Sequence, residues 1–299
     1  MNIDITLNKK ESVKMIKISV LMPIYNTNEE HLREAINSIL EQTYENFEFL
    51  IINDSPNNTK LDQIINSYND KRIVYVKNKH NMGISPSRNK LLQMSKGEYI
   101  AVMDHDDISS PERFAKQVDF LDKNKEYGVV GCNITFIPKN KTKIYPENDN
   151  DIKLALMKGC AVTHPSAMIR KQVLTDNNIC YEEFFTPSED YALWCRLIAH
   201  TKFYIIQEPL FVYRKHPKNT SGIFTKKRKE ATNALRYLVR HKHPDIYGLF
   251  LQKARFNRVY RLFGIPILKI VSQGWRFEAY LFGVILILSY KKYARIKFN

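Results

Sequence analysis

Glycine and proline are scarce in this chain of 299 residues, which contains 10 of the former and 12 of the latter. Collagen-like and glycine-rich low-complexity architectures are therefore excluded. Cysteine is also rare, and the four cysteines lie 28, 20 and 15 residues apart (Cys132, Cys160, Cys180 and Cys195). No two of them have the spacing of a metal-ligand or redox motif, so we expect reduced and mostly buried thiols.

Long hydrophobic runs are missing as well. The longest uncharged apolar run, residues 279–290, has 12 residues, whereas a helix needs roughly 20 to span a bilayer. The N-terminal residues, MNIDITLNKKESVKM, are polar and lack the apolar core of a signal peptide. We therefore expect a cytoplasmic protein, with any membrane contact made from one side.

Positive charge is in excess, and it is unevenly distributed. Of 46 Lys and Arg and 31 Asp and Glu, residues 212–299 hold 20 bases and three acids, so the rest of the chain is nearly neutral. Such a basic block needs an anionic partner or a well-solvated face. Because its cations are interleaved with large apolar residues, we favour an anionic membrane surface, with packing against the rest of the protein as the alternative. We expect no nucleic acid partner, since no nucleic-acid module accompanies the charge.

Short apolar runs alternate with helical patterns in the first part of the chain. Predicted strands occupy residues 17–23, 47–52, 73–76 and 99–103, and predicted helices occupy residues 29–42, 60–68, 86–94 and 111–124. This alternation predicts an α/β fold with a mostly parallel sheet covered by helices on both faces. Ligands of such sheets bind at the carboxyl ends of the strands, so the polar segments that follow the strands are candidate site residues.

The pattern loosens after residue 124. We expect a strand at residues 129–136, a polar loop at 138–151, a helix at 190–199, and two short strands at 203–206 and 210–213. From residue 225 onward the pattern predicts helices at 225–241 and 246–263, followed by an apolar stretch to residue 290. The C-terminal region is thus expected to be basic, apolar and helical.

The sharpest local feature is Asp104-His105-Asp106-Asp107, directly after the predicted strand 99–103. An Asp-x-Asp at a strand end brings together two hard oxygen ligands, which suit Mg²⁺ or Mn²⁺ bound to a diphosphate. The alternative for Asp107 is a role in capping the helix that follows.

Other candidates are ambiguous when each is taken alone. Asn53-Asp54-Ser55-Pro56 is an ordinary turn signal. Arg88 could bind phosphate or neutralise Asp104. Glu189 and Asp190 begin a predicted helix, where acids are expected because of the helix dipole.

Taken in order, these segments resemble the pattern of family-2 glycosyltransferases of the GT-A fold. The matching segments are VLMPIYN (20–26), SILEQTYENFEFLIINDSP (38–56), NMGISPSRN (81–89), KGEYIAVMDHDD (96–107), HPSAMIRK (164–171), SEDYALWCRL (188–197) and YRKHPKNTS (213–221). Their shared order, within residues 16–221, is far more specific than any single match. Two departures are Asn53, where the family more often has an acid, and Ser55-Pro56 in place of a glycine.

The resemblance implies a role for each matched site residue. A nucleotide sugar would be bound by Pro23, Tyr25, Asp54, Asn81, Arg88, Asp104 and Arg214. A divalent cation, Mn²⁺ or Mg²⁺, would be held by Asp104, Asp106 and His216. Asp190 would act as the general base, with Glu189 beside it.

The resemblance also implies a reaction and a setting. We expect an inverting, metal-dependent glycosyltransferase that moves a hexosyl or N-acetylhexosaminyl group from a UDP-sugar to a hydroxyl of a glycan or lipid-linked saccharide in bacterial surface polysaccharide synthesis. The alternatives are a dTDP- or GDP-sugar donor, or a non-catalytic scaffold that binds a sugar nucleotide or a membrane. Residues 1–15 would be a polar extension, 16–221 the GT-A catalytic domain, and 222–299 a region attached to the inner face of the cell membrane.

Overall fold

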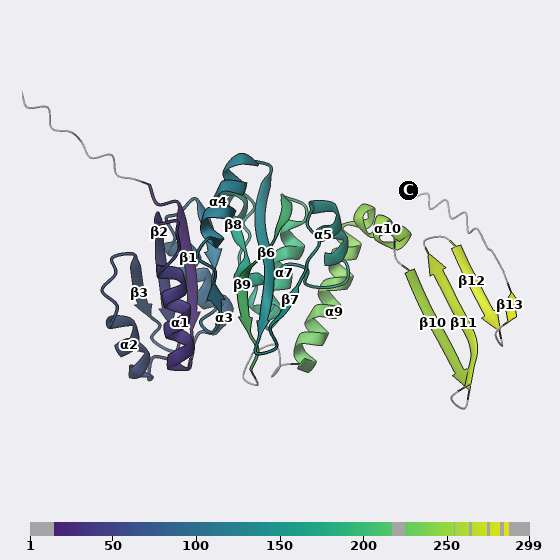
Figure 1. Ribbon diagram of the computed structural model, residues 1–299, viewed down its shortest axis with the longest axis horizontal. Coiled ribbons are helices and arrows are strands. Elements are labelled where there is room, and N and C mark those ends of the chain that lie inside the picture. The colour runs from purple at the N-terminus through teal and green to yellow at the C-terminus, as the bar shows by residue number, and fades with distance from the viewer. Residues whose placement is uncertain are drawn as a thin grey trace, which may run out of the picture.

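The structure is a computed structural model that describes residues 15–216 and 225–253, together with four strands nearer the C-terminus (Figure 1). Within these residues, nine strands form one mixed sheet, with β7 (Lys141–Lys143) paired to β6 outside the main order. That order is β3 (Ile73–Lys77), β2 (Phe47–Asn53), β1 (Ile18–Ile24), β4 (Tyr99–Val102), β8 (Met168–Arg170), β6 (Tyr127–Ile137), β9 (Lys202–Arg214) and β5 (Ile108–Ser109). Neighbours among β1 to β4 pair in parallel, so their carboxyl ends lie at one edge of the sheet.

Helices connect the strands and cover the sheet, and the last two, which follow β9, pack on other helices. They are α1 (Glu29–Leu40), α2 (Thr59–Asn66), α3 (Ile84–Met94), α4 (Arg113–Lys123), α5 (Asp149–Leu156), α6 (Lys171–Asp176), α7 (Glu189–Leu197), α9 (Thr225–Lys242) and α10 (Pro244–Lys253). The first of them shows why these segments are helical. Asn28 caps α1, because its Oδ1 accepts a hydrogen bond from the His31 amide at 3.2 Å. Leu32 and Ile36, four residues apart on one face of α1, are fully buried.

The core is densest around the central strands. Every residue of β1 and β2 is buried, as expected for strands that are covered on both faces. The turn between α3 and β4 passes so close to β1 that a Cβ at Gly97 would lie 2.5 Å from the Ser19 amide nitrogen. Only glycine fits at this position, because a larger side chain would collide with the backbone at the start of β1.

The predicted alternation of strands and helices is confirmed through residue 124. Strands β1 to β4 and helices α1 to α4 begin and end within two residues of their predicted positions. Farther along, the predicted strands 203–206 and 210–213 are one continuous strand, β9. The segment 138–151 is not a loop throughout, because it contains β7 and the start of α5. The α/β class is therefore confirmed.

Only part of the predicted helical C-terminal region is confirmed. Helices α9 and α10 form, but β10 (Arg255–Leu262), β11 (Ile265–Gln273), β12 (Arg276–Leu281) and β13 (Val284–Leu286) make a four-stranded antiparallel sheet where helix and an apolar stretch were predicted. Two residues separate neighbouring strands here, and one of the two is always glycine (Gly264, Gly274 and Gly283). Short connections containing glycine are typical of β-hairpins, and the strands are rich in Ile, Val, Phe and Tyr. No helix among the described residues is long and apolar enough to cross a membrane.

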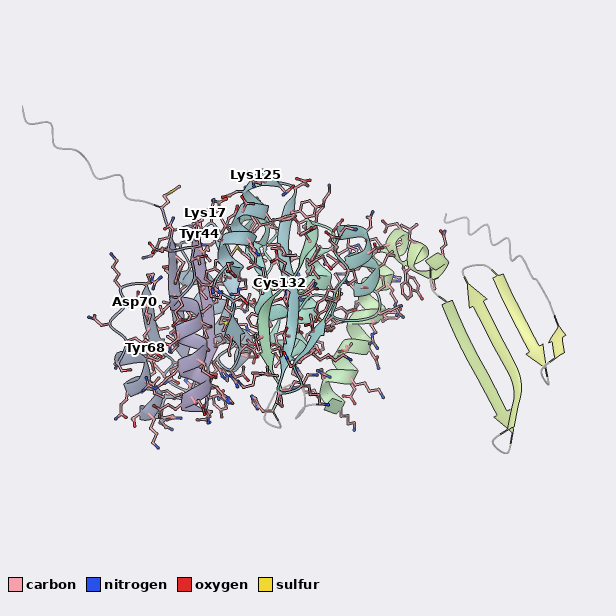
Figure 2. The ribbon with its side chains drawn as sticks, in the orientation of Figure 1. Lys17, Tyr44, Tyr68, Asp70, Lys125 and Cys132 are labelled. Atoms are coloured by element: carbon pink, nitrogen blue, oxygen red, sulfur yellow. The ribbon has the colours of Figure 1, made fainter. Side chains whose placement is uncertain are left out.

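The amino ends of the strands are stabilised by charge pairs. Lys17 Nζ lies 2.7 Å from Glu98 and 2.8 Å from Asp122. Figure 2 shows Lys17 and Tyr44 at the upper edge of the molecule, with Cys132 in the interior on β6.

All four cysteines are free thiols, but the expectation that most of them are buried is wrong, because only Cys132 is buried.

Candidate functional site

A cavity of about 1620 Å³ opens at the carboxyl ends of β1, β2 and β4. Its walls also include the first turns of α3 and α7 and one side of α9, which begins at the lower edge of the molecule in Figure 1. Nearly all of the predicted site residues line it: Pro23, Tyr25, Asp54, Asn81, Arg88, Asp104, Asp106, Glu189, Asp190 and His216. The fold therefore brings together segments that are far apart in the sequence.

Asp54 anchors the loop that leads into α3. Its Oδ1 accepts hydrogen bonds from the Met82 amide and from Asn78 Nδ2, both at 2.8 Å, and its Oδ2 accepts one from the Gly83 amide at 2.8 Å. Gly83 has a φ of +88°, which glycine adopts without a steric penalty. Since a carboxylate has about four acceptor positions, Asp54 can still accept a further hydrogen bond from a ligand.

Arg88 connects two of the acids that line the cavity, Asp104 and Glu189. Its guanidinium donates from Nη2 to Asp104 Oδ1 and from Nη1 to Glu189 Oε1, each at 2.9 Å. Burial alone would lower the pKa of Arg88, but the two carboxylates outweigh it and raise that pKa, so the side chain stays charged. Burial also raises the pKa of Asp104, although Arg88 opposes this shift. The structure thus shows Arg88 paired with Asp104, as one of the two predicted alternatives required, and with Glu189 as well, so that its charge offsets part of theirs.

Asp106 and His216 are the side chains best suited to hold a divalent cation. Asp106 Oδ2 and His216 Nε2 lie 2.7 Å apart, and both residues line the cavity. Within the described residues, no three His, Cys, Asp or Glu side chains are grouped so that they could hold a metal ion. Two protein ligands are enough where phosphate oxygens and water complete the coordination, as is usual for Mg²⁺ at nucleotide sites. The residues present therefore fit a cation that is shared with a diphosphate.

Asp190 has the environment of a general base. Burial and the neighbouring Glu189 carboxylate raise the pKa of Asp190 from 3.8 to about 6. Its Oδ1 accepts a hydrogen bond from the Tyr191 amide at 2.6 Å, and its Oδ2 lies 3.7 Å from the Cys160 thiol. A carboxylate with this pKa is mostly ionised at neutral pH and is a stronger base than an ordinary aspartate.

Arg214 is the predicted site residue that does not line the cavity. Its Nε donates to the Asp106 carbonyl oxygen at 2.9 Å, and its Nη2 contacts Glu34. Its amide donates to Asp107 Oδ1 at 2.8 Å. Asp107 is therefore not a helix cap, because α4 begins only at Arg113. Its hydrogen bond from the Arg214 amide instead connects β9 to the segment that contains Asp104 and Asp106. The role of Arg214 in binding a diphosphate remains a prediction.

Sequence reasoning missed one wall of the cavity, which is formed by helix α9. Four of its residues line the space: Arg228, Lys229, Thr232 and Arg236. The helix is held against the start of α7, where Ser188 Oγ donates to the Arg228 carbonyl oxygen at 3.4 Å and lies 3.2 Å from Thr232 Oγ1. In the sequence it is visible as a run of bases at residues 226–229, part of the basic block for which we expect a membrane surface or packing against the rest of the protein.

The chain is similar to known glycosyltransferases. Residues 19–184 match the family model described as glycosyl transferase family 2. An uncharacterized glycosyltransferase of Methanocaldococcus jannaschii, MJ1057, is 38% identical over 205 residues, which are 66% of this chain and 70% of that protein. The minor teichoic acid biosynthesis protein GgaB of Bacillus subtilis is 33% identical over 70% of this chain and 24% of its own length. The crystal structure of S. aureus TarS 1–349 in complex with UDP-GlcNAc shares the fold, with a TM-score of 0.65 at 20% identity over 79% of this chain and 72% of that one.

Proposed function

Because the chain belongs to glycosyl transferase family 2, we propose that it is an inverting, metal-dependent enzyme that transfers a sugar from a nucleotide sugar to an acceptor hydroxyl. The donor is a UDP-sugar that carries a hexosyl or N-acetylhexosaminyl group, and the cation is Mn²⁺ or Mg²⁺. The observation that carries this proposal is a single cavity lined both by the nucleotide-binding candidates at the strand ends and by the candidate base Asp190.

The strand ends are suited to bind the nucleoside. Tyr25 is 51% exposed at the cavity wall, so its ring is available to stack on a base. Asp54 is held rigidly by the loop amides and retains acceptor capacity for the uracil N–H. The complex of TarS with UDP-GlcNAc, a protein of similar fold, supports UDP as the nucleotide.

The diphosphate is proposed to lie beside Asp106 and His216. These residues would hold a divalent cation, which when bound would neutralise charge on the leaving diphosphate. Arg88 is paired with Asp104 and Glu189 nearby and offsets part of their charge, so that these carboxylates repel the diphosphate less.

Asp190 is proposed to take the proton of the acceptor hydroxyl. As the proton moves to Asp190, the acceptor oxygen forms a bond to the anomeric carbon of the sugar, and the bond from that carbon to the diphosphate oxygen breaks. The nucleoside diphosphate leaves with the bonding electrons. One base and one displacement give inversion at the anomeric carbon, which is why we propose an inverting enzyme.

The acceptor is proposed to be a glycan or lipid-linked saccharide in surface polysaccharide synthesis. The similarity to GgaB, which is named for minor teichoic acid biosynthesis, supports this class. The excess of bases after residue 212 supports attachment to the inner, anionic face of the cell membrane. The protein would then lie in the cytoplasm with its acceptor on the membrane.

Thermal unfolding in the presence of nucleotides tests this proposal directly. UDP with Mn²⁺ should raise the unfolding midpoint, because a ligand that binds only the folded state stabilises it by mass action. UDP alone should raise it less, and GDP and dTDP with Mn²⁺ should have little effect. A larger shift of the midpoint with GDP or dTDP would identify that nucleotide, and not UDP, as part of the donor. No shift with any nucleotide would favour a non-catalytic scaffold.

A further inference from the structure

We propose that the acceptor carries a phosphate group, and that Arg228 and Lys229 on the first turns of α9 bind it. This inference rests on the proposed function, because it assigns a substrate class to the acceptor side of the same cavity. Both side chains line the cavity, and both come from the helix that is hydrogen-bonded to Ser188, two residues before Asp190. An anion bound there would share the cavity with the candidate base.

The electrostatics of α9 favour a bound anion. The helix begins with bases at residues 226–229 and has no acid in its first turn. The N-terminus of a helix is the positive end of its dipole, so cations at this end are destabilising unless an anion offsets them. Among residues 15–216 and 225–253, neither Arg228 nor Lys229 forms an ion pair. Their charge is therefore available to a ligand in the cavity.

No acid that lines the cavity forms an ion pair with Arg228 or Lys229 among the described residues. Asp54 is satisfied by the loop before α3, and Arg88 holds both Asp104 and Glu189. The cavity thus has an acidic side at the strand ends and the start of α7, where Arg88 offsets part of the charge, and a basic side on α9. A donor diphosphate would lie on the first side, beside Asp106 and His216, which leaves the second side for the acceptor.

The chain offers a matched control within the same helical turn. Lys226 and Lys227 are exposed like Arg228 and Lys229, but they do not line the cavity. The double variants R228E/K229E and K226E/K227E change the net charge equally, so only their position relative to the cavity differs. The neutral variant R228Q/K229Q and the thermal midpoints of all three proteins check that the fold is retained.

Isothermal titration of the full chain, saturated with UDP and Mn²⁺, measures the effect. The probes are sn-glycero-3-phosphoglycerol for a phosphodiester polymer, geranyl diphosphate for a lipid carrier, and glycerol as the neutral comparison. At least one phosphate probe should bind and glycerol should not. The affinity should fall about tenfold or more in R228E/K229E and less than about twofold in K226E/K227E, because charge-assisted contacts act at short range while distant exposed charges are screened. The probe that binds more tightly identifies the source of the phosphate.

Four results would overturn the inference. The first two are equal losses of probe affinity in both double variants and unchanged probe affinity in R228E/K229E. The third is a loss of UDP affinity in R228E/K229E, and the fourth is binding to phosphatidylglycerol vesicles with no binding of the soluble probes. The third would assign the cations to the donor, and the fourth to membrane lipids. Failure of the wild-type protein to bind UDP would instead count against the proposed function, so the two failures are distinguishable.

Discussion

Replacing Asp190 with Asn should abolish transfer and, at neutral pH, stabilise the protein. General-base catalysis contributes about 10²- to 10⁴-fold to a rate, so a loss of this size is expected in the variant. In the wild-type enzyme, kcat/KM should rise with pH around a midpoint near 6, because burial and Glu189 raise the pKa of Asp190 to about 6 and the base must be ionised. The variant should lack this acidic limb.

The gain in stability follows from the same pKa. Asp190 titrates at about 6 in the folded protein and near 3.8 when unfolded, so folding favours its protonated form. The free energy of unfolding therefore falls as the pH rises from about 4 through 6, by on the order of 1–3 kcal/mol. Asn cannot ionise, so the variant should avoid this loss at pH 7.5. Its advantage should shrink as the pH is lowered towards 4.

Thermal unfolding at pH 5 and pH 7.5, alongside a transfer assay with labelled donor, measures both effects. A gain of 1 kcal/mol corresponds to roughly 2–4 °C in midpoint for a protein of this size. Asp176→Asn is the matched control, because Asp176 is exposed and does not line the cavity. It should leave both activity and midpoint unchanged. If D190N retained transfer within about tenfold of wild type, the base assignment would be wrong, and an unchanged midpoint at pH 7.5 would refute the buried, raised-pKa environment.

Three further changes probe the donor side of the cavity. Asp54→Asn should weaken UDP binding about tenfold or more, measured by calorimetry, because the amide replaces a charged acceptor; wild-type affinity would exclude Asp54 from the nucleotide site. Asp106→Asn should remove the Mn²⁺-dependent part of the UDP-induced midpoint shift, and an undiminished Mn²⁺ effect would argue against its role as a ligand. Gly83→Ala should lower the free energy of unfolding, measured in urea, by about 1–2 kcal/mol. The reason is backbone strain alone, because φ is +88° and a Cβ at this position would meet no other atom. Equal stability of the variant and the wild type would contradict that backbone conformation.

The carboxyl edge of the sheet was predictable because it depends on local patterns and one topological rule. Buried strands such as β1 and β2 appear in the sequence as continuous apolar runs, and their lengths fix where each ends. Residues that follow parallel strands must then meet at one edge. Asp54 and Asp104 consequently line the same cavity, although 50 positions separate them.

Features that depend on long-range packing could not be predicted in this way. The bases of α9 have the same sequence pattern whether they face a membrane or a cavity, and only the packing of α9 beside α7 shows that Arg228 and Lys229 line the cavity. The prediction of helix for the C-terminal strands was wrong for a different reason. Glycine in the short segments between these strands is the sequence signal for hairpins, whereas apolar content, on which the helix prediction depends, is common to strands and helices.

Arg88 shows what the three-dimensional structure adds to a motif. The sequence offered it as a phosphate ligand or as a counter-charge to Asp104, yet Glu189 lies 101 positions away and receives its other hydrogen bond. Removal of Arg88 would leave two carboxylates uncompensated in a largely buried setting, a change that typically destabilises a protein by about 3–5 kcal/mol. It would also lower the local positive charge that opposes the raised pKa of Asp190. The donor side and the base side of the cavity are therefore not independent, because one guanidinium is paired with Asp104 on the first and with Glu189 on the second.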